Sequence, residues 1–176
     1  MNNRGTLYIG ILLIAFGGLF FAAEVTRGLV VWRIPLGWQG LWPFILLLVG
    51  LAFWLPLLIW WGKRQRLVGL VVPGTIILFN SLLLFYQNVT GDWESWAYVW
   101  ALEPFAVGLG LLMLYALGER SSALLTAAGI VGGVGLVLFV IFASIFGGWV
   151  QVLGPAVLII IGVLLLTHSM VNRLAD

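Results

Sequence analysis

The chain has 176 residues, of which 63% are hydrophobic and 8% are charged. Soluble domains contain about 25% charged residues, and a soluble fold of this size could not bury so much apolar surface. The composition therefore excludes a soluble globular protein and indicates a single domain, residues 1–176, that lies mostly in lipid. Eight basic and six acidic residues are too few to predict a nucleic-acid surface, and without cysteine the chain has no disulfide or thiolate metal site.

Six apolar runs are long enough to cross a membrane as helices, which takes about 20 residues each. They are too long and too continuously apolar for the strands of a membrane barrel. The first run follows Arg4 and exceeds the apolar core of a signal peptide, so we interpret it as a retained helix. We thus predict an all-α integral membrane protein with spans at 6–24, 41–61, 67–87, 97–117, 122–146 and 149–169.

A short pattern, Leu-x-Pro followed six or seven residues later by glycine and an aliphatic residue, occurs three times. Because each copy falls at the second span of a pair, it predicts three tandem helical hairpins, at about 4–62, 63–118 and 119–176. Two-span repeats enter the membrane in the same orientation, so we expect a pseudo-threefold bundle of parallel repeats. The three prolines that mark the repeat are Pro43, Pro104 and Pro155.

These prolines have two possible roles. Proline is tolerated in the first turn of a helix, where its missing N–H leaves no gap. Pro43 fits such a start. Pro104 and Pro155 leave too few residues before the inner ends of their spans to cross a membrane, so their helices are expected to start earlier and kink about two turns in, or to begin below the headgroups. Alternatively, all three line a shared outer cavity.

Basic residues set the predicted topology. With six spans both termini lie on one side, which has six of the eight lysines and arginines, including the inner basic anchor Lys63, Arg64 and Arg66. The other side has only Arg27 and Arg33. The positive-inside rule then predicts that both termini lie in the cytoplasm.

The positions of the tryptophans support the same predicted topology. Indole rings favour the headgroup region, where an apolar body and an N–H donor are both accommodated. Most tryptophans fall in or beside the predicted outer connections, where we expect an aromatic belt formed by Trp32, Trp38, Trp42, Trp93, Trp96, Trp100 and Trp149.

The span 122–146 has a stripe of small residues spaced four, three and four apart. Small residues let two helix backbones approach closely in a membrane. We therefore expect another helix to pack against Ser122, Thr126, Gly129 and Gly133.

Glu103 is the candidate functional residue with the most unusual position, because it lies between apolar residues within a predicted span. Ionisable groups in membranes are costly and often functional. One interpretation places Glu103 near the outer interface, where an acid suits a helix N-terminus. The other makes it a proton or cation site, paired with Arg27 or Arg33.

Two further polar residues are candidates. Asn80 falls near the middle of the span 67–87 and is expected to hydrogen-bond across helices. His168 is the one histidine and lies near the inner end of the last run, as a plain interfacial residue or as a ligand or proton relay. Paired carboxylates, histidine clusters and Ser-His-Asp sets are missing from the sequence, so we predict no enzyme, no catalytic or metal residues and no cofactor.

The first hairpin resembles a known family. Arg4-Gly5-Thr6, the outer step Leu41-Trp42-Pro43 and the following Gly50-Leu51 are similar to the transmembrane region of LiaI/LiaF-type bacterial envelope proteins, over about residues 4–55. The resemblance implies a role in cell-envelope stress through protein contacts, but the LiaF pattern includes a soluble C-terminal domain that this chain lacks. In size and hairpin repetition the chain is also similar to six-helix acid-resistance proteins of the HdeD type.

The sequence leaves two functions open. The first is a structural or regulatory membrane protein that contacts lipids and binds a membrane-protein partner or a second copy of itself. The second is a small transporter, channel or lipid-binding module with a cavity between hairpins near Glu103. A dry centre of Leu, Ile and Gly favours the first, and a polar cavity reaching Glu103 favours the second.

Overall fold

The computed structural model describes residues 3–31, 34–35, 37–118 and 120–147, together with seven single or paired positions between 152 and 163. The predicted sixth span, 149–169, thus lies outside the continuously described residues. The same holds for His168 and for the side chains of Trp32, Arg33 and Trp149.

The first half of the chain contains two apolar helices, α1 and α3, with short elements between them. Helix α1 spans Asn3–Val25, and the strands β1 (Val30–Val31) and β2 (Ile34–Pro35) form a small antiparallel ribbon that the sequence did not predict. Helix α2 covers Trp38–Leu41 and leads directly into α3, Pro43–Ile59.

The basic turn after α3 consists of short helical pieces: the 3-10 helix η1 (Trp61–Lys63), α4 (Arg64–Leu67) and the 3-10 helix η2 (Val68–Leu70). Helix α5 then runs from Val71 to Thr90 and ends at Gly91, whose φ of 71° is the left-handed conformation that glycine adopts easily.

The next span begins with short helical pieces and becomes regular at Pro104. The pieces are η3 (Trp93–Ser95), α6 (Trp96–Val99) and η4 (Trp100–Leu102), followed by α7, Glu103–Leu117. Proline lacks an N–H and so tends to interrupt regular helical hydrogen bonding upstream. Helix α8 covers Ser122–Phe146, which matches the predicted span 122–146.

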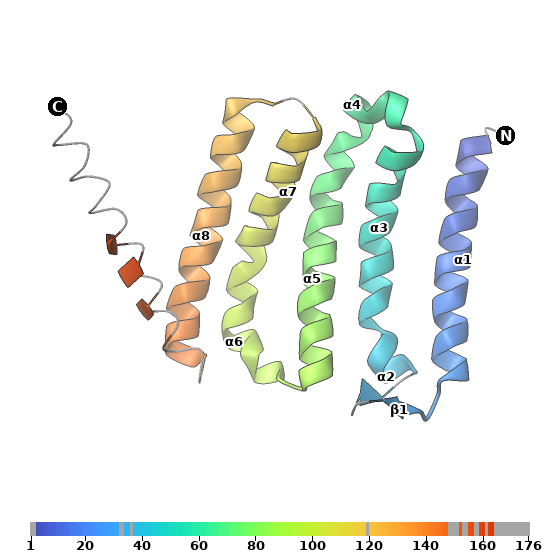
Figure 1. The fold of residues 1–176 in the computed structure, drawn as a ribbon, viewed down its shortest axis with the longest axis horizontal. Coiled ribbons are helices and arrows are strands. Elements are labelled where there is room, and N and C mark those ends of the chain that lie inside the picture. Colours follow the sequence, from blue (N-terminus) through green and yellow to red (C-terminus); the bar gives the residue numbers. More distant parts are fainter. Residues whose placement is uncertain are drawn as a thin grey trace.

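Four helical stretches are long and apolar enough to cross a membrane: Asn3–Val25, Trp61–Thr90, Trp93–Leu117 and Ser122–Phe146. The helix Pro43–Ile59 is shorter but equally apolar, and it lies beside the others with α2 extending it at one end (Figure 1). The large hydrophobic side chains exposed along these helices, such as Ile14, Leu58 and Ile130, have no protein cover and suit contact with lipid tails. The chain is therefore a multi-pass helical membrane protein.

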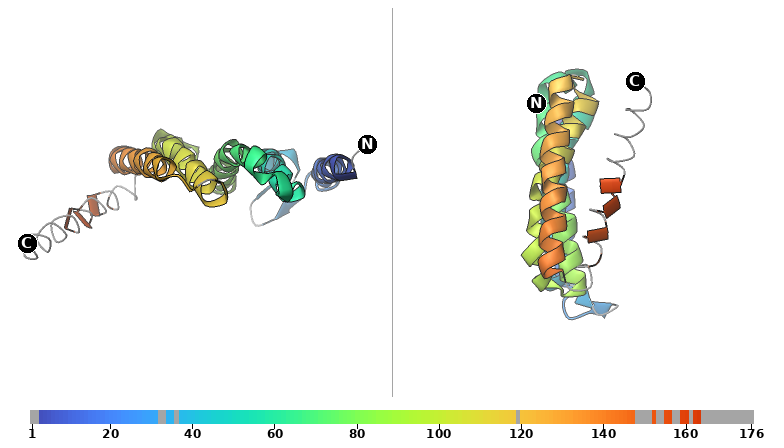
Figure 2. Two further views of the ribbon diagram at one scale, coloured as in Figure 1. Left: turned by 90° about the horizontal axis from the view of Figure 1, so that it is seen from above. Right: turned by 90° about the vertical axis from the view of Figure 1, so that its left-hand side faces the viewer.

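The long helices stand side by side in chain order as a single row (Figure 1), and the edge-on views show one layer (Figure 2). Helix α3 packs between α1 and α5, and α7 packs between α5 and α8. Since α1 and α8 lie at opposite ends of the described row, the expected pseudo-threefold bundle is wrong for these helices. A shared cavity around Pro43 and Pro104 is wrong as well, because α5 separates α3 from α7.

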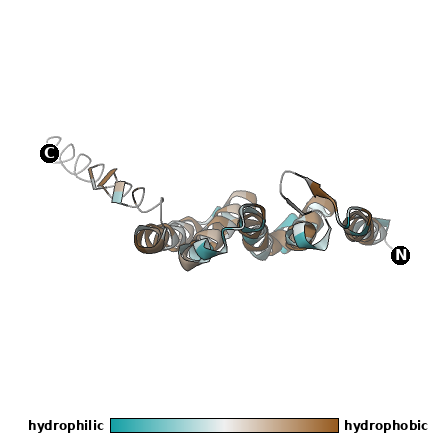
Figure 3. Cartoon of the chain, turned by 90° about the horizontal axis from the view of Figure 1, so that it is seen from below, coloured by the Kyte–Doolittle hydropathy of each residue, from teal (hydrophilic) through white to brown (hydrophobic). Residues whose placement is uncertain are grey.

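Glycines set the spacing within the row. A Cβ added at Gly50 would lie 2.7 Å from Leu78 of α5, and one added at Gly74 would lie 2.7 Å from Trp54 of α3. Close approach lets the neighbouring side chains interlock without help from a hydrophobic effect, which is absent between helices in lipid. Helices α3 and α5 therefore pack closely on each other, and most residues along the row are hydrophobic (Figure 3).

Candidate functional site

Asn80 places a polar group in the middle of the apolar helix α5. It is the tenth of the 20 residues of α5, so about 15 Å of helix separates it from each end. Its Nδ2 donates hydrogen bonds to Glu103 Oε2 at 3.0 Å and to the Ile76 carbonyl oxygen at 3.2 Å. The prediction that Asn80 hydrogen-bonds across helices is confirmed, with α7 as the partner helix.

The contact with Asn80 also places Glu103. Glu103 is the first residue of α7 and the eleventh of the 25-residue apolar stretch Trp93–Leu117, level with the centre of α5. This depth does not match the interfacial position considered from the sequence. The residues Trp93–Leu102 form the outer part of the same span, so the carboxyl group lies below them, half-buried between α5 and α7.

Arg27 is not the partner of Glu103. Arg27 Nη1 lies 3.3 Å from Glu24 Oε1, and both side chains are largely exposed at the end of α1. Moreover, none of the eight lysines and arginines falls inside any of the six apolar runs of the sequence. The expected pairing with Arg27 is therefore wrong, and the contact recorded for the Glu103 carboxyl is the neutral amide of Asn80.

Ser81, the next residue of α5, fixes the start of α3. Its buried hydroxyl donates to the carbonyl oxygen of Pro43 at 3.1 Å. Pro43 is the first residue of α3, which confirms the predicted helix start. Pro104 is the second residue of α7, and Pro155 lies among the isolated described positions.

A second polar cluster joins the outer ends of α2, α3 and α5. Trp42 Nε1 donates to Asn88 Oδ1, and Asn88 Nδ2 donates to the Gly40 carbonyl oxygen, both at 3.2 Å. The Trp42 ring also stacks on Trp93 with centroids 6.3 Å apart. One asparagine side chain thus ties the α2–α3 corner to α5.

The tryptophans of the predicted belt that the structure describes gather at this same end of the helices, near the α2–α3 corner. They belong to α2, to the following corner and to η3, α6 and η4, and they are half-buried or partly exposed: Trp38, Trp42, Trp93, Trp96 and Trp100. Such exposure suits rings that meet headgroups on one side and protein on the other.

A buried hydrogen-bonded set fixes the turn after α5. Gln87 Nε2 donates to Ser95 Oγ at 3.1 Å, Ser95 Oγ donates to the Asp92 carbonyl oxygen at 2.6 Å, and Ser95 N donates to Asp92 Oδ1 at 3.2 Å. Gln87 is fully buried. Gln87 lies at the end of the predicted span 67–87, and no spacing signal in the sequence links it to Ser95.

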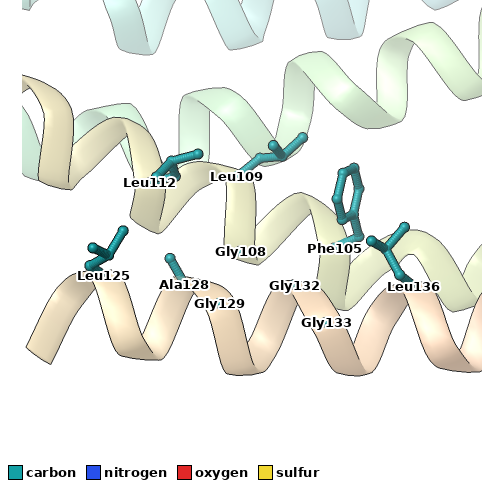
Figure 4. Close-up of a pocket in the computed structure, with 10 residues that line it drawn as sticks. All are labelled: Phe105, Gly108, Leu109, Leu112, Leu125, Ala128, Gly129, Gly132, Gly133 and Leu136. Atoms are coloured by element: carbon teal, nitrogen blue, oxygen red, sulfur yellow. The ribbon is translucent and has the colours of Figure 1, made fainter. Parts of the chain in front are cut away.

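Helices α7 and α8 make the closest contact and enclose an apolar groove of about 310 Å³ between them (Figure 4). The predicted stripe of small residues in α8 does not make this contact, because nothing lies within 4 Å of a Cβ added at Gly129 or Gly133. The packing residues are instead Ala128, Gly132 and Gly135, one position away. Neither Glu103 nor Asn80 lines the groove.

The inner basic anchor lies at the opposite end of the helices, away from the tryptophans. Lys63, Arg64 and Arg66 are exposed in η1 and α4, and the Arg64 guanidinium lies 5.2 Å from the centroid of the Trp61 ring. The start of α1 and the α7–α8 connection lie at this same end (Figure 1). The predicted grouping of these connections on one side of the membrane therefore agrees with the row.

Comparisons with known proteins give no relative. No protein-family model matches the chain, and neither a curated protein nor a solved structure matches it.

Proposed function

We propose that this chain is a non-enzymatic, structural or regulatory protein of the bacterial inner membrane that binds a partner membrane protein at the level of Glu103. Both termini lie in the cytoplasm, and residues 149–169 form a sixth span. The observation that carries the proposal is the Asn80–Glu103 contact: a carboxyl group at mid-membrane whose recorded partner is a neutral amide.

The energetics favour an external partner. An aspartate at the centre of a membrane helix costs about 2.5–3.5 kcal/mol on insertion scales, and such acids usually pair with a base or face a polar path. Since no lysine or arginine falls inside this chain's own apolar runs, a second copy of the chain would not bring one to that depth either. A transmembrane segment of another protein with a lysine or arginine would pair with Glu103.

The architecture supports the same proposal. In the described row, each of α3, α5 and α7 is covered on two sides by its neighbours and open on the other two (Figure 2). A partner helix can therefore reach a carboxyl group between α5 and α7 without entering a closed core. The suggested link to envelope stress rests on the resemblance of residues 4–55 to LiaI/LiaF-type proteins, which act through protein contacts.

The same polar pair supports a second candidate function, the movement of protons or cations through a small transporter or channel. Both functions need Glu103, but they differ in what the purified chain does alone. A transporter moves its solute in liposomes without a partner, whereas a partner-binding protein needs the second protein for its role.

The test is purification in mild detergent, followed by identification of co-purifying proteins and by proton and cation flux in liposomes. We expect a membrane protein to co-purify with the wild type and with Glu94→Gln, a control at an exposed acid of the outer turn, and to be lost with Glu103→Gln. A chain that purifies alone and gives flux abolished by Glu103→Gln would replace the first function with the second.

A further inference from the structure

The turn between α3 and α5 concentrates positive charge without a matching acid. Residues 62–66 are Gly-Lys-Arg-Gln-Arg, and the sequence from Val25 to Gly91 contains no aspartate or glutamate. Lys63 and Arg66 are exposed, and neither takes part in the ion pair or the side-chain hydrogen bonds recorded for the described residues. Two free cations therefore stand at the end of a membrane helix, where lipid headgroups lie.

These two cations share a pocket with apolar walls. The pocket has a volume of about 280 Å³, and its lining combines Lys63 and Arg66 with Pro56, Trp60 and Leu67. A second hollow of about 300 Å³ is lined by the same lysine and arginine together with Gly62 and Gln65. Positive charge thus lies above an apolar surface, in the order that a phospholipid presents phosphate above its acyl chains.

The frame of the pocket is fixed by neighbouring contacts. The Trp60 ring makes an edge contact with Tyr8 of α1, with centroids 6.0 Å apart, and Tyr8 Oη donates to the Ala52 carbonyl oxygen at 3.2 Å. The Lys63 backbone N–H donates to the Trp60 carbonyl oxygen at 2.7 Å. Since the ring and the backbone of the turn are held before any ligand binds, the entropy lost on binding is confined to the two cationic side chains and the ligand.

From this arrangement we propose that the α3–α5 turn is a binding site for an anionic phospholipid. Lys63 and Arg66 bind the phosphate, and the apolar wall of Pro56, Trp60 and Leu67 receives the upper part of an acyl chain. Basic pockets at the ends of transmembrane helices are known to suit anionic headgroups. A free phosphate ion would use the two cations but not the apolar wall, so the pocket favours the lipid as the source of the anion.

The experiment is native mass spectrometry of the full chain with phosphatidylglycerol, with phosphatidylcholine as the neutral probe. We expect the wild type to retain phosphatidylglycerol preferentially, and the double variant Lys63→Gln, Arg66→Gln to lose about tenfold in affinity, which corresponds to about 1.4 kcal/mol. The matched control is Arg4→Gln, Arg120→Gln, which removes the same charge at exposed positions elsewhere and should leave affinity unchanged.

Three results would overturn the proposal: equal retention of both lipids by the wild type, equal losses in the two double variants, or displacement of the lipid by millimolar inorganic phosphate. A further variant, Trp60→Ala, separates the lipid from a soluble anion. It keeps both cations but removes apolar wall, so phosphatidylglycerol affinity should fall. An unchanged affinity in that variant would count against an acyl-chain contact. Thermal unfolding in phosphatidylcholine, unchanged for each variant, shows that the fold is intact.

Discussion

Gly108 of α7 and Gly132 of α8 bring two helix backbones into direct contact: a Cβ added at Gly108 would lie 2.5 Å from the Gly132 Cα. The atoms of Gly132 that this Cβ would meet belong to the backbone, so no side chain can rotate away to make room. The contact explains why the α7–α8 pair is the most closely packed in the row, and it gives the first prediction.

Gly108→Ala should destabilise the protein by about 1–3 kcal/mol, because the helices must move apart to fit one methyl group. The matched control is Gly129→Ala, whose Cβ meets nothing within 4 Å. Alanine is a better helix former than glycine, so this control should be neutral or slightly stabilising. Reversible unfolding in detergent micelles measures both, and equal stabilities would contradict the α7–α8 packing.

Ser95→Ala should cost about 1–3 kcal/mol, because it leaves the fully buried Gln87 Nε2 without its acceptor. The double variant Gln87→Leu, Ser95→Ala removes donor and acceptor together and should recover most of the loss. Unfolding of both variants in the same detergent tests the set. A double variant less stable than the single one would show that Gln87 stabilises the turn in another way.

Trp42→Phe should destabilise the outer corner by about 0.5–1.5 kcal/mol, since it keeps an aromatic ring but removes the N–H that bonds Asn88. Trp38→Phe is the control: Trp38 contacts Phe20 by its ring, with centroids 4.8 Å apart, and a phenylalanine keeps a ring there. If the control loses as much stability as Trp42→Phe, ring volume rather than the hydrogen bond is responsible.

The absence of cysteine from the sequence makes topology directly measurable. Single cysteines at Gln65 and Ser121 lie in the α3–α5 and α7–α8 connections, at one end of the helices. They should react with a membrane-impermeant thiol reagent only from the cytoplasmic side. Single cysteines at Gln39 and Glu94, at the other end, should react only from outside. The reverse pattern would invert the proposed orientation, and mixed labelling at one end would contradict the row.

Much of the fold could be predicted from the sequence because lipid imposes simple rules. Length and hydropathy gave the span 122–146 as α8 has it, and the missing N–H of Pro43 gave the start of α3. These features depend on local composition or on one residue's own chemistry. The six-span count and the hairpin repeat stay predictions, since the last span lies outside the described residues.

Which faces meet could not be predicted. Helix α8 has two stripes of small residues one position apart, and both satisfy the spacing rule for close approach. The stripe ending at Gly129 and Gly133 lines the open groove beside the contact, whereas Gly132 and Gly135 fit Gly108 and Phe105 of α7. The choice depends on the partner helix, which hydropathy does not encode, and the same is true of an open row against a threefold bundle.

The depth of Glu103 was ambiguous for a related reason. Counted back from Leu117, α7 is too short to span a membrane, so an interfacial start at Glu103 was reasonable. The structure adds the helical pieces of Trp93–Leu102 above it and the hydrogen bond to Asn80 beside it. The predicted span 97–117 already starts before Pro104, and the missing N–H of Pro104 accounts for the change from short pieces to the regular helix α7.

The most direct test of the central claim is photo-crosslinking in living cells from position 107, one helical turn after Glu103 on the same face of α7. We predict an adduct with a different membrane protein that has a lysine or arginine within a transmembrane segment. The adduct should disappear with Glu103→Gln and persist with Glu94→Gln. An adduct of two copies of this chain, or one that survives Glu103→Gln, would contradict the account.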